Sequence, residues 1–150
     1  MSERIVMIGA GYWSQFQVEG WRDAGAPLAA ICNRRLGNAE ALARRDGVPR
    51  CYDDIEAMLD AERPTLVDVC LPPVAQEPAV RAAIERGIPA ICQKPFGIDL
   101  NQAEAMTALA EAAGVPAIAL GGMDEARGAA AIAASFHGWA AIDAWRTLRS

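Results

Sequence analysis

Short apolar runs alternate with longer amphipathic stretches through the first 120 residues of the chain. The runs are nearly free of charge, which is typical of strands that are buried on both faces of a parallel sheet. Only Asp68 interrupts them with a charge. The predicted strands span residues 5–8, 28–32, 66–71, 88–92 and 115–120.

The stretches between these strands have the spacing and the end signals of helices. Glycine follows most of them, as is usual just past a helix end, and Asp53 with Glu56 and Asp99 with Gln102 form start signals. The last helix carries an inner stripe of Leu100, Ala103, Met106, Ala110 and Ala113. The predicted helices cover residues 12–24, 37–45, a short segment opened by Asp53, 74–86 and 99–113.

Strictly alternating strands and helices predict an α/β fold with a doubly wound parallel sheet, which is a Rossmann-like arrangement. In an open sheet of this kind, ligands bind outside the carboxyl ends of the strands. Gly9, Asn33, Leu71, Gln93 and Lys94 all fall at such ends. We therefore expect one crevice to collect them.

The first predicted strand runs into Gly9-Ala10-Gly11, and a helix starts near Tyr12. Glycine lacks a Cβ atom, so the backbone can turn sharply and approach a ligand closely. The free N–H groups and the dipole of the following helix favour a phosphate group. Ser14 stands where the dinucleotide fingerprint has Gly or Ala. We predict a pyrophosphate site here, with an ordinary glycine turn as the alternative.

The second predicted strand ends in Cys32-Asn33-Arg34-Arg35. Sites that prefer NAD place a carboxylate about 20 residues after the glycines, where it binds the ribose hydroxyls. Here two guanidinium groups replace it, and guanidinium suits the 2′-phosphate of NADP. The sequence thus favours NADP over NAD. The alternative is a solvated arginine pair that binds no ligand.

Composition and charge argue against several classes of function. A net charge of −5 argues against nucleic-acid binding. No charge-free run reaches the length of about 18 apolar residues that a membrane span needs. The 4 cysteines lie far apart and the chain has 1 histidine, so neither a metal site nor a disulfide framework is expected, and a cytoplasmic location is the simplest. Cysteines at strand ends are expected to be small core residues.

Gln93-Lys94-Pro95-Phe96 follows the fourth predicted strand. A lone lysine before a proline is most often a surface residue. At this strand end, however, its ammonium group would face the nicotinamide ring, where it could orient a substrate hydroxyl and assist the loss of its proton.

Taken in order, these motifs resemble the dinucleotide-binding half of the glucose-fructose oxidoreductase and inositol dehydrogenase (Gfo/Idh/MocA) family over about residues 2–117. The resemblance implies reversible hydride transfer between a nicotinamide cofactor and a sugar, a polyol or a related carbonyl compound. The residues that carry it are Gly9-Ala10-Gly11, Leu71-Pro72-Pro73, Ala82-Ala83 with Gly87, and Lys94-Pro95 before an alanine-rich helix.

The resemblance also implies roles for individual residues. The glycines, with Tyr12 and Trp13 beside them, would contact the pyrophosphate, and Asn33 and Arg34 the adenosine ribose and its phosphate. Lys94 would contact the nicotinamide ribose and the substrate as the catalytic residue. The full set of expected cofactor-binding residues is Gly9, Ala10, Gly11, Tyr12, Trp13, Asn33, Arg34, Arg35, Leu71, Pro72, Pro73, Gln76, Gln93, Lys94 and Pro95.

Two positions depart from the family pattern. Gln93 replaces the glutamate that precedes the family's lysine, which removes a charge beside Lys94. Gln76 replaces a histidine that often follows the Pro-Pro pair. Neither replacement excludes cofactor binding.

The resemblance stops near residue 117, where the family would continue into a second α/β domain that supplies an Asp and a His to the active site. We expect a dinucleotide-binding domain over residues 1–120 and an Ala/Gly-rich tail over residues 121–150, with helices at 123–135 and 139–149. His137 has no proton-relay neighbours and is not expected to be catalytic. The abrupt end favours a truncated or frame-shifted product that is weakly active or inactive alone.

Two other classes of function stay open. One is a non-catalytic nucleotide-binding or redox-sensing module whose Trp-bearing tail docks onto a protein partner or a second copy. The other is a methyltransferase that uses S-adenosylmethionine, although Arg34-Arg35 and Lys94-Pro95 have no clear part to play there.

Overall fold

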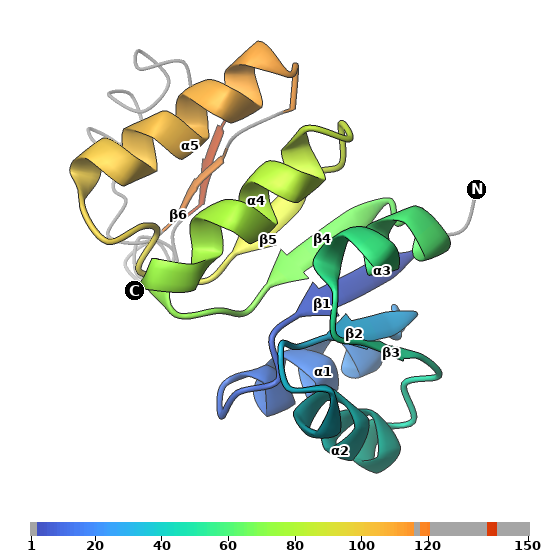
Figure 1. Ribbon diagram of the computed structural model, residues 1–150. Coiled ribbons are helices and arrows are strands. Elements are labelled where there is room, and N and C mark those ends of the chain that lie inside the picture. The colour runs from blue at the N-terminus through green and yellow to red at the C-terminus, as the bar shows by residue number, and fades with distance from the viewer. Residues whose placement is uncertain (1–2, 116–117, 121–137, 141–150) are drawn as a thin grey trace, which may run out of the picture.

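The computed structural model describes residues 3–115, 118–120 and 138–140 (Figure 1). The strands are β1 (Ile5–Ile8), β2 (Ala30–Cys32), β3 (Cys51–Tyr52), β4 (Leu66–Val69), β5 (Ala90–Cys92), β6 (Ile118–Leu120) and β7 (Gly138–Ala140). The helices are α1 (Ser14–Asp23), α2 (Leu36–Asp46), α3 (Ile55–Glu62), α4 (Gln76–Ile84) and α5 (Leu100–Ala112), with a 3₁₀ turn, η1, at Pro73–Ala75.

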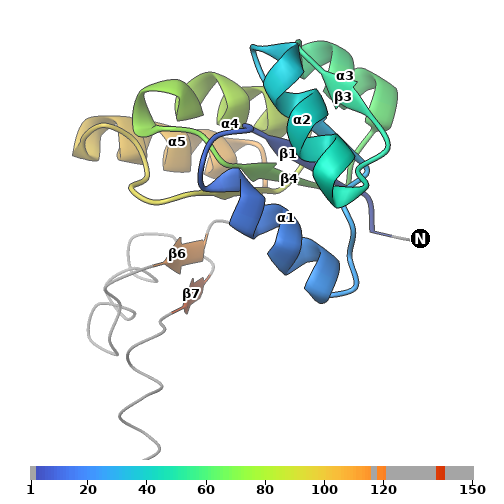
Figure 2. The ribbon, with the colours of Figure 1, turned by 90° about the horizontal axis from the view of Figure 1, so that it is seen from below.

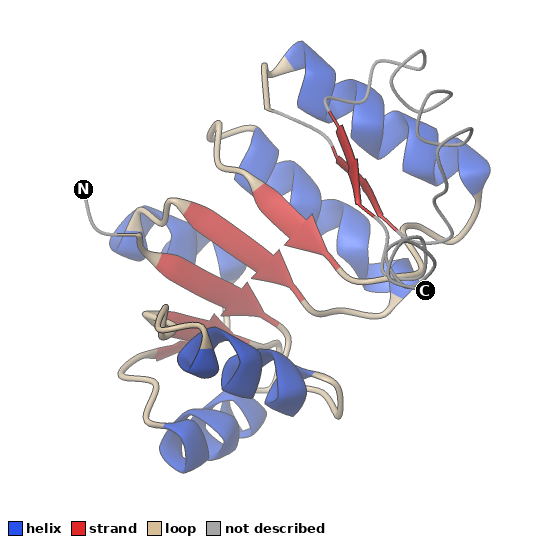
Figure 3. Cartoon of the chain, turned by 180° about the vertical axis from the view of Figure 1, so that it is seen from behind, coloured by secondary structure: helices blue, strands red, loops and turns tan. Residues whose placement is uncertain are grey.

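A five-stranded parallel sheet in the order β3-β2-β1-β4-β5 forms the centre of the molecule, and its strands run side by side in one direction (Figure 3). Helices α1 and α2 pack on one face, whereas α3, α4 and α5 pack on the other. Figure 2 shows α1 on the opposite side of the sheet from α4 and α5. This arrangement confirms the predicted doubly wound α/β fold. None of the helices in the described ranges is long and apolar enough to cross a membrane.

The first strand shows why its apolar run is unbroken. Ile5 and Met7 are buried in the core beneath α1 and α2, and Val6 and Ile8 in the core beneath α3, α4 and α5. Because successive side chains of a strand point to opposite faces, a strand covered on both sides has no position left for a polar residue.

Asp68 is the charged exception within β4, and it is fully buried. The indole N–H of Trp21 donates to its Oδ2 atom at 2.7 Å. Burial raises the pKa of the Asp68 carboxyl, and the hydrogen bond from Trp21 opposes that rise. This contact joins α1 to the sheet.

Two strand predictions need correction. β3 was not predicted, because two residues are too few to give an apolar run. Residues 115–120 were expected to add a strand to the main sheet. Instead, Ile118–Leu120 pairs with Gly138–Ala140 in a separate two-stranded parallel sheet. An apolar run predicts a strand but does not specify which strand it pairs with.

The expected helix over residues 139–149 is wrong at its start, because Trp139 and Ala140 lie in β7. Aromatic residues fit a strand well, so their helical spacing was a weak signal. The expected helix over 123–135 and the rest of the tail lie outside the described residues.

The structure also shows which residues cap the starts of two helices. The carboxylate of Asp54, not of Asp53, caps α3 and accepts the Ala57 N–H at 2.7 Å. Asp99 caps α5 as predicted and accepts the Gln102 N–H at 2.9 Å.

The predicted buried stripe of α5 is confirmed only in the middle of the helix. Met106 and Ala110 are buried and Ala103 is half-buried, whereas Leu100 and Ala113 are exposed. Leu100 and Ala113 lie in the first turn and just past the last one, where a helix has least contact with the core.

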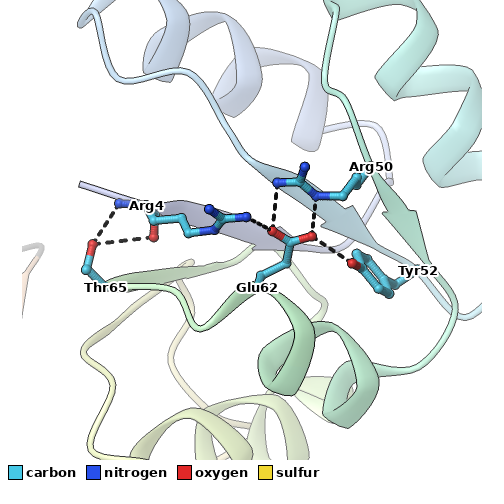
Figure 4. Close-up of polar contacts among 5 residues, drawn as sticks. All are labelled: Arg4, Arg50, Tyr52, Glu62 and Thr65. Atoms are coloured by element: carbon cyan, nitrogen blue, oxygen red, sulfur yellow. Dashed lines mark hydrogen bonds and ion pairs between the residues drawn. The ribbon is translucent and has the colours of Figure 1, made fainter. Parts of the chain in front are cut away.

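A polar cluster closes the amino-terminal edge of the sheet (Figure 4). The buried carboxylate of Glu62 accepts hydrogen bonds from the guanidinium groups of Arg4 and Arg50 and from the Tyr52 hydroxyl, the last at 2.7 Å. Thr65 Oγ1 accepts the Arg4 N–H at 2.9 Å. Burial disfavours the Glu62 charge, but these hydrogen bonds outweigh it and lower the pKa of Glu62 to about 2. The cluster ties the end of α3 to the start of β1, through Arg4, and to β3, through Arg50 and Tyr52.

Candidate dinucleotide site

The carboxyl ends of four strands meet along one edge of the sheet. The register places the last residues of β2, β1, β4 and β5 opposite one another. The residues that follow these strands therefore form a row across the edge, in the order Asn33, Gly9, Cys70 and Gln93. The structure thus brings together the strand ends that were expected to share one crevice.

Asn33 links the first loop to the end of the second strand. The Gly9 N–H donates to the Cys32 carbonyl at 2.8 Å, and the Ala10 N–H donates to Asn33 Oδ1 at 3.2 Å. The Asn33 amide in turn donates to the Arg35 carbonyl at 2.9 Å. The two loops are therefore held in one arrangement.

The two glycines of the first loop are required for different reasons. Gly9 has a φ of +117°, and a Cβ atom there would lie 2.2 Å from the Cys70 carbonyl oxygen. A Cβ atom on Gly11 would meet no atom of the described residues within 4 Å, so these residues leave the space beside it open. Ser14 is buried, and its Oγ atom accepts the Gly11 N–H at 3.1 Å. The serine thus closes the turn without filling the space beside Gly11.

The start of α1 offers backbone donors at this edge. No side chain in the described part of the chain caps α1. The N–H groups of Tyr12 and Trp13 have no hydrogen-bond acceptor within the described part of the chain. Uncapped N–H groups at the positive end of a helix dipole bind anions, so the loop fits a pyrophosphate group.

The aromatic side chains beside this loop gather on the surface. Tyr12, Trp13 and Phe16 are exposed, and the Trp13 and Phe16 ring centroids lie 5.2 Å apart. Trp13 therefore stands next to the loop in contact with solvent.

The end of the second strand carries charge of both signs. Arg34 and Arg35 are exposed and form no ion pair with any carboxylate in the described ranges. The Asn33 N–H donates to the Tyr52 carbonyl at 3.0 Å, which places Asp53, an exposed residue, at the same edge. Sequence reasoning missed Asp53 because the strand before it, β3, gives no apolar run.

Lys94 lies on the connection from β5 to α5. The Gln93 N–H donates to the Val69 carbonyl at 3.1 Å, which holds the start of this connection on the sheet. The Lys94–Pro95 peptide bond is cis. The Lys94 side chain is exposed and pairs with no carboxylate of the described residues. Lys94 thus follows directly on the row of strand ends, with its side chain exposed.

The connection after β4 lies between the glycine loop and the lysine. Leu71 and Pro73 are half-buried and Pro72 is exposed. A Cβ atom on Gly9 would lie 3.3 Å from Leu71 Cδ2, so this side chain adjoins the glycine loop.

Gln76 joins this connection to the loop that carries the lysine. Its side chain is fully buried, and Nε2 donates to the carbonyls of Leu71 at 3.1 Å, Gln93 at 2.8 Å and Pro95 at 3.1 Å. Oε1 accepts the Gly97 N–H at 2.9 Å. Nothing in the sequence pattern predicted this network.

The cysteines near the edge are core residues, as expected for Cys32 and Cys70, which are both buried. Burial raises the pKa of Cys32 to about 12, and nearby Asp54 and Asp53 add to the rise. Burial also raises the pKa of Cys92 to about 12. These thiols are protonated at neutral pH and are poor nucleophiles.

Comparisons with known proteins agree with this geometry. The model of the GFO_IDH_MocA family (oxidoreductase family, NAD-binding Rossmann fold) matches residues 3–120. A D-apiose dehydrogenase from Paraburkholderia graminis is 39% identical over 111 residues, which cover 73% of this chain and 30% of that protein. An inositol 2-dehydrogenase from Paracoccus denitrificans is 34% identical over 128 residues, which cover 82% of this chain and 38% of that protein.

A solved structure is similar as well. It is an oxidoreductase from Agrobacterium radiobacter in complex with NAD⁺, L-tartaric acid and magnesium, with a TM-score of 0.73 and 32% identity over 77% of this chain and 34% of that one. The present chain spans about a third of the length of these relatives. The fold, the glycine loop and the match over residues 3–120 lead to one conclusion: this chain belongs to the Gfo/Idh/MocA oxidoreductase family, through its NAD-binding Rossmann fold.

Proposed function

We propose that residues 1–120 bind the dinucleotide cofactor of an oxidoreductase that acts on a sugar, a polyol or a related carbonyl compound. The observation that supports this most strongly is the single row of strand ends, which puts the glycine loop, Asn33 and Gln93 on one edge. The substrate class follows from the relatives, which include an apiose dehydrogenase and an inositol dehydrogenase.

Each part of the edge has a task in this proposal. The open space beside Gly11 and the free N–H groups of Tyr12 and Trp13 receive the pyrophosphate. Asn33 and Arg34 face the adenosine ribose. The segment from Leu71 to Pro73 borders the dinucleotide along its length. Bound nicotinamide supplies the hydride acceptor or donor.

Lys94 is the catalytic residue in this proposal. Its ammonium group donates a hydrogen bond to the substrate hydroxyl and holds it near the nicotinamide position. When the hydroxyl carbon is oxidised, the hydroxyl proton passes to solvent water and the ammonium group stabilises the negative charge that develops on the oxygen. In the reverse direction the same ammonium polarises the carbonyl oxygen.

We also propose that NADP binds more tightly than NAD. Arg34 and Arg35 support this preference, because a guanidinium fork can donate two hydrogen bonds to a 2′-phosphate. Asp53 acts in the opposite direction, because its exposed carboxylate stands at the same edge. The balance between these charges decides the preference.

A titration tests the proposal. NADP, NAD and S-adenosylmethionine are added in turn to the full chain while tryptophan fluorescence is followed, with a Trp13→Phe variant to isolate the signal of the exposed indole. We expect saturable quenching by NADP, weaker quenching by NAD and none by S-adenosylmethionine. Saturable quenching by S-adenosylmethionine alone would instead support the methyltransferase alternative.

Turnover should be low in the same preparation. The chain spans about a third of the length of its relatives, so we expect it to bind the dinucleotide but to reduce it slowly or not at all with a polyol. Steady reduction of NADP by a polyol, followed at 340 nm, would contradict this expectation.

A further inference from the structure

We propose that Gln76 is a positioning residue, which fixes Lys94 relative to the segment from Leu71 to Pro73. This inference rests on the proposed function of the edge, because it gives Lys94 and that segment their tasks. Gln76 itself touches neither the cofactor nor the substrate in this proposal, since its side chain has no exposed surface.

The chemistry of the site requires an amide. The backbone groups around the side chain are three carbonyls, which need a donor, and one N–H group, which needs an acceptor. A terminal amide offers two N–H donors and one carbonyl acceptor, so it can serve all four groups when one N–H is shared. A carboxylate would bring no donor to the three carbonyls, and an aliphatic side chain would bring neither a donor nor an acceptor.

The position of Gln76 explains how its side chain holds the loop around Lys94 in place. It is the first residue of α4, and that helix is fixed to the sheet by buried Ala79, Val80 and Ala83. The amide is therefore held by the core. From there it bonds to both sides of Lys94, at the Gln93 and Pro95 carbonyls.

The loop around Lys94 has little other support from burial. Lys94, Pro95 and Phe96 are all exposed, and Gly97 is the buried residue that follows them. Buried backbone groups that lose their partners cost about 1–3 kcal/mol each. Removing the amide thus releases the loop as a unit, while α4 keeps its apolar contacts.

The chain offers a clean probe, because Lys94 is its only lysine. Reductive methylation with ¹³C-formaldehyde labels the Lys94 ε-amine and the N-terminal amine, and the two dimethylamino signals separate by their pH titration in NMR spectra. The full chain is compared with Gln76→Leu, Gln76→Glu and Val80→Ala. The last variant loses core packing in the same helix without touching the amide network.

We expect one sharp Lys94 signal in the wild-type chain and in Val80→Ala, with or without NADP. In Gln76→Leu and Gln76→Glu the ligand-free signal should broaden or split, and NADP should bind about tenfold more weakly. Val80→Ala should lower the melting temperature but bind NADP as the wild type does.

Several outcomes would overturn the inference. The inference fails if both folded Gln76 variants give the same Lys94 signal as the wild type. It also fails if the Lys94 signal of Val80→Ala broadens or splits as much as that of the Gln76 variants. If Gln76→Leu does not fold, Gln76→Glu and Gln76→His decide, because both keep a polar side chain. If the wild-type chain binds neither NADP nor NAD, the proposed function fails, while the ligand-free spectra still decide the part of Gln76.

Discussion

Gly9 and Gly11 stand two residues apart in one loop, yet they meet different physical demands. At Gly9 a positive φ and the nearby Cys70 carbonyl leave no room for a Cβ atom. At Gly11 the backbone conformation and the surroundings both tolerate one, and what a side chain would fill is the open space of the proposed site. One glycine is therefore required by the fold, and the other by the proposed ligand.

Alanine substitutions separate the two demands. Gly9→Ala should lower the free energy of unfolding by about 2–4 kcal/mol, because the methyl group collides with backbone and the residue must hold a positive φ. Gly11→Ala should leave stability within about 1 kcal/mol and weaken dinucleotide binding. Urea denaturation and an NADP titration of both variants measure this. The reverse order of the two stability losses would contradict the assignment.

In the proposed function, the charges at the end of the second strand decide between the two nicotinamide cofactors. Arg34→Ala should lower the affinity for NADP by about tenfold or more, because one charge-assisted contact to the 2′-phosphate is lost. The affinity for NAD should change little. Asp53→Asn should raise the affinity for NADP and leave the affinity for NAD nearly unchanged or lower. Titrations with both cofactors measure the ratio of affinities. Equal losses for NADP and NAD in Arg34→Ala would contradict the proposed 2′-phosphate contact.

At the scale of elements, the two edges of the sheet have opposite characters. The amino-terminal edge is closed by ion pairs and hydrogen bonds that converge on Glu62, as Figure 4 shows. At the carboxyl edge, none of the described side chains caps helix α1, and the side chains of Arg34 and Lys94 are exposed. The stabilising cluster and the proposed binding site therefore lie at different ends of the sheet.

Glu62 predicts how stability depends on pH. Its pKa falls from an ordinary 4.5 to about 2 in the folded chain. A lowered folded pKa means that the stabilisation is fully present above about pH 4.5 and is lost as the pH falls toward 2. The contribution at neutral pH is on the order of 3 kcal/mol.

Urea denaturation of wild type and Glu62→Gln between pH 2 and 7 tests this. The variant should be less stable at pH 7 and should lose less stability than the wild type on acidification. Its affinity for NADP should not change, since the cluster lies at the far edge. A parallel fall of both proteins with pH would exclude Glu62 as the titrating group.

The elements also show how far sequence reasoning reaches. Apolar runs predicted β1, β2, β4 and β5. The first three are covered on both faces, which gives a strong local signature, whereas β5 lies at the edge of the sheet and exposes Ile91. Strand β3 and the pairing of β6 depend on partners distant in the chain, and no local pattern encodes them. The same holds for Asp53 and Gln76, whose surroundings exist only once the strands are assembled.

At the scale of the whole molecule, the parallel direction of the strands is what creates a candidate site. Residues that stand between 9 and 94 in the sequence are brought to one edge because each crossover returns the chain to the same side. Hydrogen bonds join Ala10 to Asn33 and Gln76 to Gln93, and between them the Cys70 N–H donates to the Ile8 carbonyl. The edge thus offers a preassembled surface to an extended ligand.

One measurement tests this account most directly: a titration of the ¹⁵N-labelled chain with NADP, followed residue by residue in amide NMR spectra. The account predicts that the largest shifts fall on residues 9–13, 33–35, 71–76 and 93–97, while the amides around Glu62 stay unchanged. Shifts that are absent at saturating NADP, or that concentrate around Glu62 at the amino-terminal edge, would contradict it.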